Sequence, residues 1–270
     1  MGANMAKNLI LYFSGTGNSL AAAKRIAKEI GDTDIRAMAA YPEPEGEYER
    51  VGFIYPCYAA GLPRFVKEYI EKLDVERLES EYYFAVETYG GWPGNSTTHI
   101  NKILRTKGEV LSFAINIKMF ANYIALYSMK DNAKAMAKEA DTELSSVAVT
   151  IRKKIRNSNT HRAALMGIFY KIGLPMMLKK IKYFHVSGEC TGCGNCERLC
   201  PTKNIRLEPD TQDTAMYHSP KKPVIGVNCE QCMACIQWCP MQAINYKNKT
   251  TSRKRYTHPA IHISEMFLRD

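Results

Sequence analysis

The feature that most constrains this 270-residue chain is a cysteine pattern that occurs twice in its last third. Each copy reads C-x2-C-x2-C-x3-C-P, first with Cys190, Cys193, Cys196 and Cys200, then with Cys229, Cys232, Cys235 and Cys239. The sequence shows no secretory signal, and clustered Cys-x2-Cys spacings in such a chain favour metal ligands over disulfides. Two zinc sites are the alternative, but a third cysteine and a Cys-Pro ending fit four-ligand zinc poorly. Soft thiolates suit iron–sulfur clusters, which the repeat therefore predicts.

This segment resembles the bacterial two-cluster ferredoxins, and the resemblance implies two [4Fe–4S] clusters. In those proteins the fourth cysteine of each motif ligates the other cluster. One cluster is thus expected on Cys190, Cys193, Cys196 and Cys239, and the other on Cys229, Cys232, Cys235 and Cys200. The interval 201–228 is longer than in the shortest members, but it lies between the motifs and leaves this assignment unchanged.

The first half of the chain alternates short apolar runs with helical patterns, which is typical of a parallel sheet with crossover helices. Strands are expected over 8–13, 35–38, 50–55, 82–88 and 110–117. Helices are expected from about Ser19, around Val66–Leu73 and Ile100–Leu104, and along a stripe from Ala140 to Ile155. The pattern predicts an α/β fold of doubly wound type, with five parallel strands.

A glycine- and hydroxyl-rich loop, Ser14-Gly15-Thr16-Gly17-Asn18-Ser19, comes directly after the first expected strand and opens a helix. Backbone N–H groups at the amino end of a helix bind phosphate well. The loop lacks the lysine of a nucleotide-hydrolysing P-loop and the G-x-G-x-x-G spacing of a dinucleotide site. It resembles the phosphate loop of flavodoxins, which implies that Ser14, Thr16, Gly17, Asn18 and Ser19 bind the phosphate of FMN.

Two further loops follow the third and fourth expected strands, where ligands of such sheets bind. By the same resemblance they contact the FMN ring, with stacking from Tyr58, Tyr89 or Trp92, which the sequence does not rank. The residues expected at the ring are Pro56, Tyr58, Ala59, Gly61, Thr88, Tyr89, Gly90, Gly91, Trp92 and Asn95. Cys57 lies in the first of these loops. It is either an ordinary small buried residue or a group that tunes the flavin.

The formal net charge of +10 is concentrated outside the two expected domains. Nine Lys or Arg and no Asp or Glu lie between Leu144 and Gly188. We expect a flavodoxin-like domain over 1–157, a basic connector over 158–186, a ferredoxin domain over 187–247 and a basic tail over 248–270 that folds back onto the body. The connector could pack between the domains, dock an acidic redox partner or rest on an anionic membrane surface. No nucleic-acid-binding motif accompanies the charge, so nucleic acid is not an expected partner.

The order of the domains resembles the flavodoxin–ferredoxin fusion proteins of anaerobic bacteria and archaea. The resemblance implies a cytoplasmic electron relay in which one-electron clusters and FMN exchange electrons with a redox partner protein. The alternative is a reductase in which FMN, fed through the clusters, reduces a small molecule. The sequence contains no arguable pair of nucleophile and base, so no catalytic residue is assigned, and it does not predict the oligomeric state.

Overall fold

The computed structural model describes residues 7–157, 164–209 and 221–268. Its first part is built on a five-stranded, fully parallel sheet in the order β2-β1-β4-β6-β7. This is the flavodoxin-like doubly wound order, so the predicted fold class is confirmed. The strands are β1 (Asn8–Tyr12), β2 (Thr33–Ala37), β4 (Arg50–Pro56), β6 (Tyr83–Tyr89) and β7 (Leu111–Lys118). Because all five run the same way, the loops that follow them meet at one edge of the sheet.

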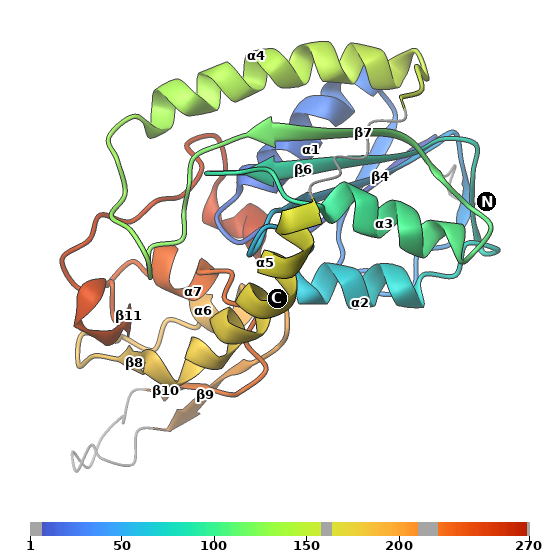
Figure 1. Cartoon of the computed structure of the whole chain (residues 1–270). Coiled ribbons are helices and arrows are strands. Elements are labelled where there is room, and N and C mark those ends of the chain that lie inside the picture. The colour runs from blue at the N-terminus through green and yellow to red at the C-terminus, as the bar shows by residue number, and fades with distance from the viewer. Residues whose placement is uncertain (1–6, 158–163, 210–220, 269–270) are drawn as a thin grey trace, which may run out of the picture.

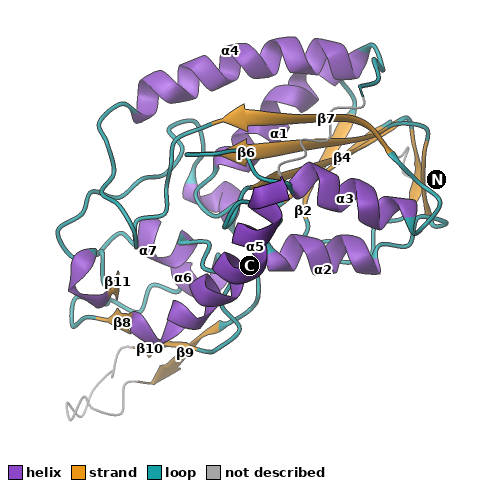
Figure 2. Ribbon diagram, in the orientation of Figure 1, coloured by secondary structure: helices purple, strands orange, loops and turns teal. Residues whose placement is uncertain are grey.

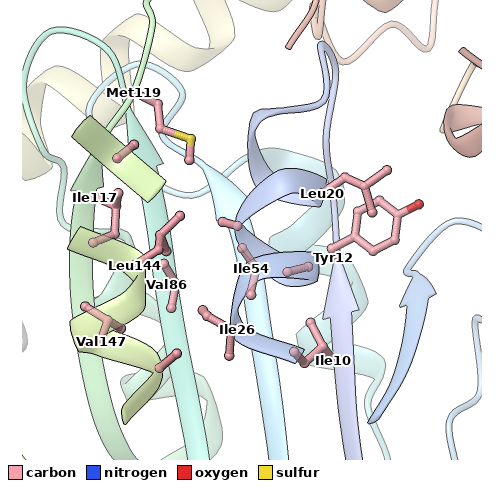
Figure 3. Close-up of a cluster of buried hydrophobic side chains, with 14 of the residues drawn as sticks. Ile10, Tyr12, Leu20, Ile26, Ile54, Val86, Ile117, Met119, Leu144 and Val147 are labelled. Carbon is pink, nitrogen blue, oxygen red and sulfur yellow. The ribbon is translucent and has the colours of Figure 1, made fainter. Parts of the chain in front are cut away.

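Two pairs of helices cover the faces of the sheet (Figure 1). Helices α1 (Asn18–Ile30) and α4 (Ala133–Arg152) pack against each other on one face, and α2 (Arg64–Lys72) and α3 (Ser96–Arg105) cover the other. Each face has its own apolar core, and Figure 3 shows the one beneath α1 and α4. The predicted stripe of the last helix is right as far as Ile151. It is wrong at Ile155, which lies beyond the end of α4 and is 50% exposed.

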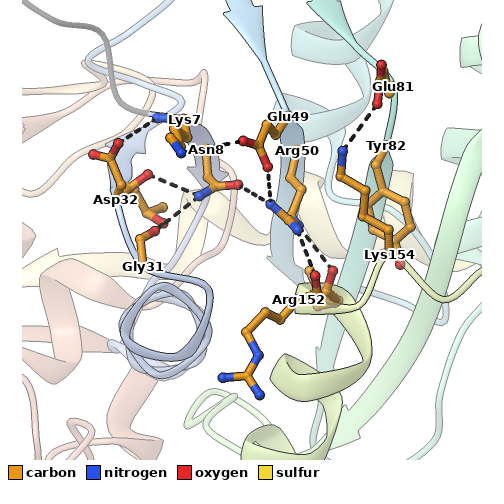
Figure 4. A network of polar contacts seen from close by, with 12 residues as sticks. Lys7, Asn8, Gly31, Asp32, Glu49, Arg50, Glu81, Tyr82, Arg152 and Lys154 are labelled. Carbon is orange, nitrogen blue, oxygen red and sulfur yellow. Dashed lines mark hydrogen bonds and ion pairs between the residues drawn. The ribbon is translucent and has the colours of Figure 1, made fainter.

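A buried arginine holds the C-terminal end of α4 against the sheet (Figure 4). Arg50 donates from Nε to the carbonyl oxygen of Ile151 (3.1 Å) and from Nη2 to that of Arg152 (2.7 Å). Its Nη1 donates to Asn8 Oδ1 and Glu49 Oε2, both at 3.0 Å. A cation there adds hydrogen bonds to carbonyls at the end of the helix, where Ile151 also accepts from the N–H of Lys154, and complements the helix dipole.

One small sheet of the first domain is absent from the sequence expectations. Strands β3 (Gly46–Tyr48) and β5 (Leu78–Ser80) pair in parallel beside the main sheet. They are too short for the alternation of apolar and polar residues to mark them as strands.

The cysteine-rich part that follows consists, among the described residues, of two antiparallel strand pairs and two single-turn helices. Strand β8 (Phe184–Val186) pairs with β11 (Ile244–Tyr246), and β9 (Ile205–Pro209) pairs with β10 (Lys221–Ile225). Helices α6 (Asn195–Arg198) and α7 (Ala234–Gln237) each begin within one cysteine motif. Strand β8 lies in the segment expected as connector, because the strand ladder needs residues upstream of the first cysteine. In Figures 1 and 2 this part lies at the end of the sheet toward which the β6 and β7 arrowheads point.

The connector and the tail both pack onto the domains. Helix α5 (Ala164–Leu178) buries Leu174 and Met177 and leads through a 3-10 turn (Lys179–Tyr183) into β8. The tail buries Tyr256, Ile261 and Met266, the last two in the core that α1 and α4 cover. A 3-10 turn, Lys247–Lys249, lies where the tail begins, and a second one, Ile263–Met266, lies near its end. The expectation that the tail folds back is therefore confirmed.

Candidate functional site

The eight clustered cysteines line two separate cavities. One is lined by Cys190, Cys193, Cys196 and Cys239, and the other by Cys200, Cys229, Cys232 and Cys235. These are the two sets that the sequence assigns to the two clusters. Within the described part of the chain, no three His, Cys, Asp or Glu side chains converge as they would around a single metal ion. Each set instead spreads over the wall of a cavity, the arrangement that a cube-shaped cluster needs.

Backbone groups point at several of these thiols. The N–H of Asn204 donates to Cys200 Sγ (3.2 Å), and in the second motif that of Ala243 donates to Cys239 Sγ (3.3 Å). Such donors favour a ligating thiolate. Burial, and then the neighbouring cysteines, raise the pKa of the Cys235 thiol well above its usual value. Cys196 of the other set is among these neighbours, so the two cavities lie close together. Cys193 is exposed, so the first cavity reaches the surface.

The two cysteine loops share a strained backbone but not the residues that carry it. Positions three and five of the first motif are Gly192 (φ +67°) and Gly194 (φ +78°), and glycine adopts such angles freely. The same positions of the second motif hold Gln231 (φ +56°) and Met233 (φ +63°). Side-chain-bearing residues are uncommon in this left-handed region, and their presence there is a cue to function.

A larger cavity of about 730 Å³ opens at the edge where the carboxyl ends of the strands meet, and we call it the central cavity. All three predicted loops contribute to its wall. From them come Ser14, Gly15, Asn18, Ser19, Pro56, Cys57, Tyr58, Ala59, Ala60, Thr88, Tyr89, Gly90, Gly91 and Trp92. The rest of the wall, which sequence reasoning missed, comes from Phe120–Tyr123, Leu126 and Tyr127 after β7, from α5 and Lys180 after it, and from Gln231–Met233 of the second motif.

Four residues expected at the cofactor are not among those that line the cavity, and each supports it from behind. Gly17 adopts φ +96° at the start of α1, and its N–H donates to Ser14 Oγ (3.1 Å). Thr16 is buried and accepts a hydrogen bond from Asn122 Nδ2. Gly61 packs under α5, where an added Cβ would lie 2.2 Å from the ring of Tyr170. The N–H of Asn95 donates to the carbonyl oxygen of Ala60 (3.1 Å).

We call residues 14–19 the phosphate-type loop. Some of its side chains make hydrogen bonds to other parts of the protein. Asn18 donates from Nδ2 to the carbonyl oxygen of Phe120 (3.0 Å), and its Oδ1 accepts from the hydroxyl of Tyr256 in the tail (2.7 Å). Ser19 and Thr88 share a hydrogen bond between their hydroxyls (3.0 Å). The loop is thereby held rigidly at the amino end of α1, where the helix dipole favours an anion.

The second cysteine loop touches this phosphate-type loop. A Cβ added to Gly15 would lie 2.1 Å from the carbonyl oxygen of Cys232, so only glycine allows the approach. The indole Nε1 of Trp238, at the end of α7, donates to the carbonyl oxygen of Gly15 (3.0 Å). Cys232 itself lines both the second cysteine cavity and the central cavity. Met233 also lines both cavities, so these two neighbouring residues form a wall that the two sites share.

A buried acid beneath the central cavity was also missed by the sequence analysis. Glu87 of β6 is fully buried, and burial raises the pKa of its carboxyl group to about 7. It accepts hydrogen bonds from the N–H of Gly94 (2.8 Å) and the hydroxyl of Ser96. Burial and the nearby Glu87 raise the pKa of the Cys57 thiol well above its usual value. The thiol is therefore protonated near neutral pH, as in an unreactive cysteine.

Comparison with known proteins agrees with this reading of the second half of the chain. Residues 189–244 match the family model of the 4Fe-4S dicluster domain. The first half of the chain has the flavodoxin-like strand order. The chain therefore combines a domain of flavodoxin-like fold with a segment that matches the 4Fe-4S dicluster domain.

Solved structures similar to the fusion protein align with its flavodoxin-like half. A flavodoxin from the domain Archaea is 15% identical, with 53% of this chain and 98% of that chain covered and a TM-score of 0.34. The two-electron reduced flavodoxin of Megasphaera elsdenii is 17% identical over 53% and 98%, with a TM-score of 0.35. The Trp repressor binding protein of Bacillus subtilis is 11% identical over 52% and 96%, with a TM-score of 0.36.

Two further comparisons add less. No curated protein matches the fusion protein significantly. Among the residues that the structure describes, no helix is both long and apolar enough to cross a bilayer.

Proposed function

We propose that the protein binds FMN in the central cavity and one [4Fe–4S] cluster in each cysteine cavity, and that it relays electrons between them. The observation that carries this proposal is the place of Cys232, which lines the second cysteine cavity and the central cavity at once. A cluster held by Cys232 stands one side chain away from a ring in the central cavity. Cofactors so placed exchange electrons without any moving part of the protein.

The residues of the central cavity fit FMN. Its phosphate would be held at the amino end of α1 by the loop that contains Ser14 and Ser19, which supplies backbone N–H groups and hydroxyls and no competing carboxylate. Aromatic side chains from three segments, Tyr58, Tyr89 and Phe120, line the cavity and offer faces for a flat ring to stack on. When bound, FMN accepts one or two electrons, whereas each cluster carries one. The fusion therefore converts single-electron flow into a two-electron event, or the reverse.

The two cysteine cavities suggest a direction for the relay. Cys193 of the first cavity is exposed, whereas burial raises the pKa of the second-set thiols Cys232 and Cys235 strongly. We infer that electrons from a donor enter at the first cluster, pass to the second and reach FMN across Cys232.

A redox partner protein is the proposed acceptor at the flavin. Large apolar side chains are exposed around the mouth of the central cavity, namely Trp92 (78%), Leu126 (67%) and Phe169 (63%). Lys180 lines the cavity, and within the described part of the chain no Asp or Glu does. A partner protein with an apolar surface surrounded by acidic residues would complement this mouth. A substrate-reducing enzyme would instead be expected to enclose its ligand, so we favour the carrier over the reductase. The cytoplasmic location stays a prediction.

Anaerobic purification followed by quantitation of FMN, iron and sulfide tests the composition. The proposal expects one FMN and about eight irons per chain, since each [4Fe–4S] cluster holds four. Stopped-flow reduction through the clusters should then bleach the flavin absorbance in a phase that does not depend on protein concentration. A protein that holds zinc in place of iron, or flavin that is reduced only in bimolecular collisions, would contradict the relay.

A further inference from the structure

The second cysteine loop contributes a side chain to the central cavity at a backbone position that disfavours side chains. Gln231 occupies the position that Gly192 holds in the first motif, and both have positive φ (+56° and +67°). The left-handed conformation carries a conformational cost for every residue except glycine. Glycine would adopt this conformation without strain. The presence of glutamine instead indicates that its side chain has a function.

The amide of Gln231 is buried and fixed in orientation. The residue is 1% exposed, and its Oε1 accepts a hydrogen bond from the hydroxyl of Tyr123 (3.2 Å). Burial, followed by the charges of nearby groups, raises the pKa of the Tyr123 phenol, which therefore stays protonated and acts as the donor. Since the oxygen of the amide faces Tyr123, its nitrogen is directed elsewhere.

That nitrogen is one of the few buried polar atoms without a partner. Among the described residues, Gln231 Nε2 finds no hydrogen-bond acceptor. Gln231 and Tyr123 both line the central cavity. A buried donor left unsatisfied is destabilising, and such groups in native proteins have a specific reason. The missing acceptor is therefore expected on whatever fills the cavity.

We propose that the carboxamide of Gln231, supplied by the dicluster domain, donates a hydrogen bond to an acceptor atom of the isoalloxazine ring. This inference rests on the proposed binding of FMN in the central cavity. Under this proposal both domains contribute to the flavin site, because Gln231 lies between the cluster cysteines Cys229 and Cys232. Tyr123 acts as a positioning residue that orients the amide.

Gln231→Gly is the sharpest test, because glycine is what the first motif carries at this position. The variant removes the amide and at the same time relaxes the backbone. We expect unfolding under anaerobic conditions at the same or a higher temperature, unchanged iron content, and about fivefold weaker binding of flavin, the usual effect of one hydrogen bond. Gln231→Leu, which keeps the bulk of the side chain, should weaken binding to a similar extent.

Riboflavin serves as a second probe, because it has the ring but not the phosphate. If Gln231 contacts the ring, the Gly and Leu variants lose the same factor for FMN and for riboflavin in a fluorescence titration. A loss for FMN alone would trace the effect to the adjacent phosphate-type loop and overturn the inference. Tyr123→Phe, which frees the amide to rotate, should give a smaller loss of the same kind.

The outcome separates this inference from the function on which it rests. A wild-type protein that binds neither flavin contradicts the proposed function. A wild-type protein that binds both, beside Gly and Leu variants that bind both equally well, refutes the role of Gln231 and leaves the relay standing.

Discussion

Replacing Gly15 by alanine should separate the phosphate-type loop from the second cysteine loop. The new Cβ would lie 2.1 Å from the carbonyl oxygen of Cys232, and contacts under 3.0 Å do not occur, so the two backbones must move apart by about 1 Å. Overpacking of this kind costs about 1–3 kcal/mol. The movement also strains the hydrogen bond from Trp238 to the carbonyl oxygen of Gly15, worth about 1 kcal/mol. The expected loss in free energy of unfolding is about 2–4 kcal/mol.

Thermal unfolding of the anaerobic protein measures this loss. For a chain of this size it corresponds to a decrease in Tm of about 4–16 °C. Gly91→Ala is the matched control, because Gly91 also lines the central cavity but an added Cβ there meets nothing within 4 Å. Gly15→Ala should in addition bind flavin more weakly and slow its reduction through the clusters. If the two variants unfold at the same temperature and reduce flavin equally fast, the close contact between the loops is not what joins the sites.

Three further predictions concern the cluster cysteines and two buried acids. Cys200→Ser should alter the EPR signal of the cluster beside the flavin, whereas Cys239→Ser should alter that of the entry cluster and leave the other intact. Both variants should slow reduction of the flavin by the donor, so EPR of the reduced proteins distinguishes them, and the reverse assignment would contradict the ligand sets. The raised pKa of Glu87 means that the folded state holds this proton more tightly than the unfolded state, so stability should fall by about 3 kcal/mol as pH rises from 4.5 to 7. Glu87→Gln should flatten that slope in denaturant titrations, and an unchanged slope would show that Glu87 is not its source. Glu230 in the second cysteine motif is buried and accepts hydrogen bonds from Arg64 Nε (3.2 Å) and from the N–H of Phe65 (3.1 Å). Burial raises the pKa of its carboxyl group to about 7. At pH 8, where this acid is ionised, Arg64→Met should destabilise the protein by about 2–4 kcal/mol because it removes the paired cation, and Glu230→Gln in the same chain should recover most of the loss in a double-mutant cycle.

The parts of the fold that the sequence predicted well are those with a local signal. Except for β2, which includes Asp34 and Arg36, the main strands are runs of mostly apolar residues, and α1 follows a loop whose glycines and hydroxyls mark a helix start. The end of α4 was misjudged, because the apolar spacing continues to Ile155 although the helix stops at Arg152. Arg50, which caps that end, lies about a hundred residues away in sequence, and no local pattern reveals such a contact.

The sequence predicted the three loops that form much of the central cavity, but not the other segments that line it. The three loops that bear predicted cofactor residues follow strands, and the parallel order of the sheet brings them to one edge. The loop Phe120–Tyr123 also follows a strand, so the same rule applied to β7 would have found it. The contributions of α5 and Gln231 depend on how the two domains pack, which the sequence does not encode locally. Asn18 was expected to bind phosphate, and it lines the central cavity. Its amide also contacts Phe120 and Tyr256, which no local pattern in the sequence indicates.

The bonds that hold the phosphate-type loop have a consequence for the order in which the protein matures. Asn18 Oδ1 is satisfied by Tyr256, the carbonyl oxygen of Thr16 accepts from the N–H of His258 (2.8 Å), and that of Gly15 accepts from Trp238. All three partners are synthesised more than two hundred residues after the loop. On the ribosome, the five-stranded sheet can therefore form before the phosphate-type loop has the partners that hold it in place. We therefore expect the proposed FMN to be held firmly only after Trp238, Tyr256 and His258 have folded onto this loop.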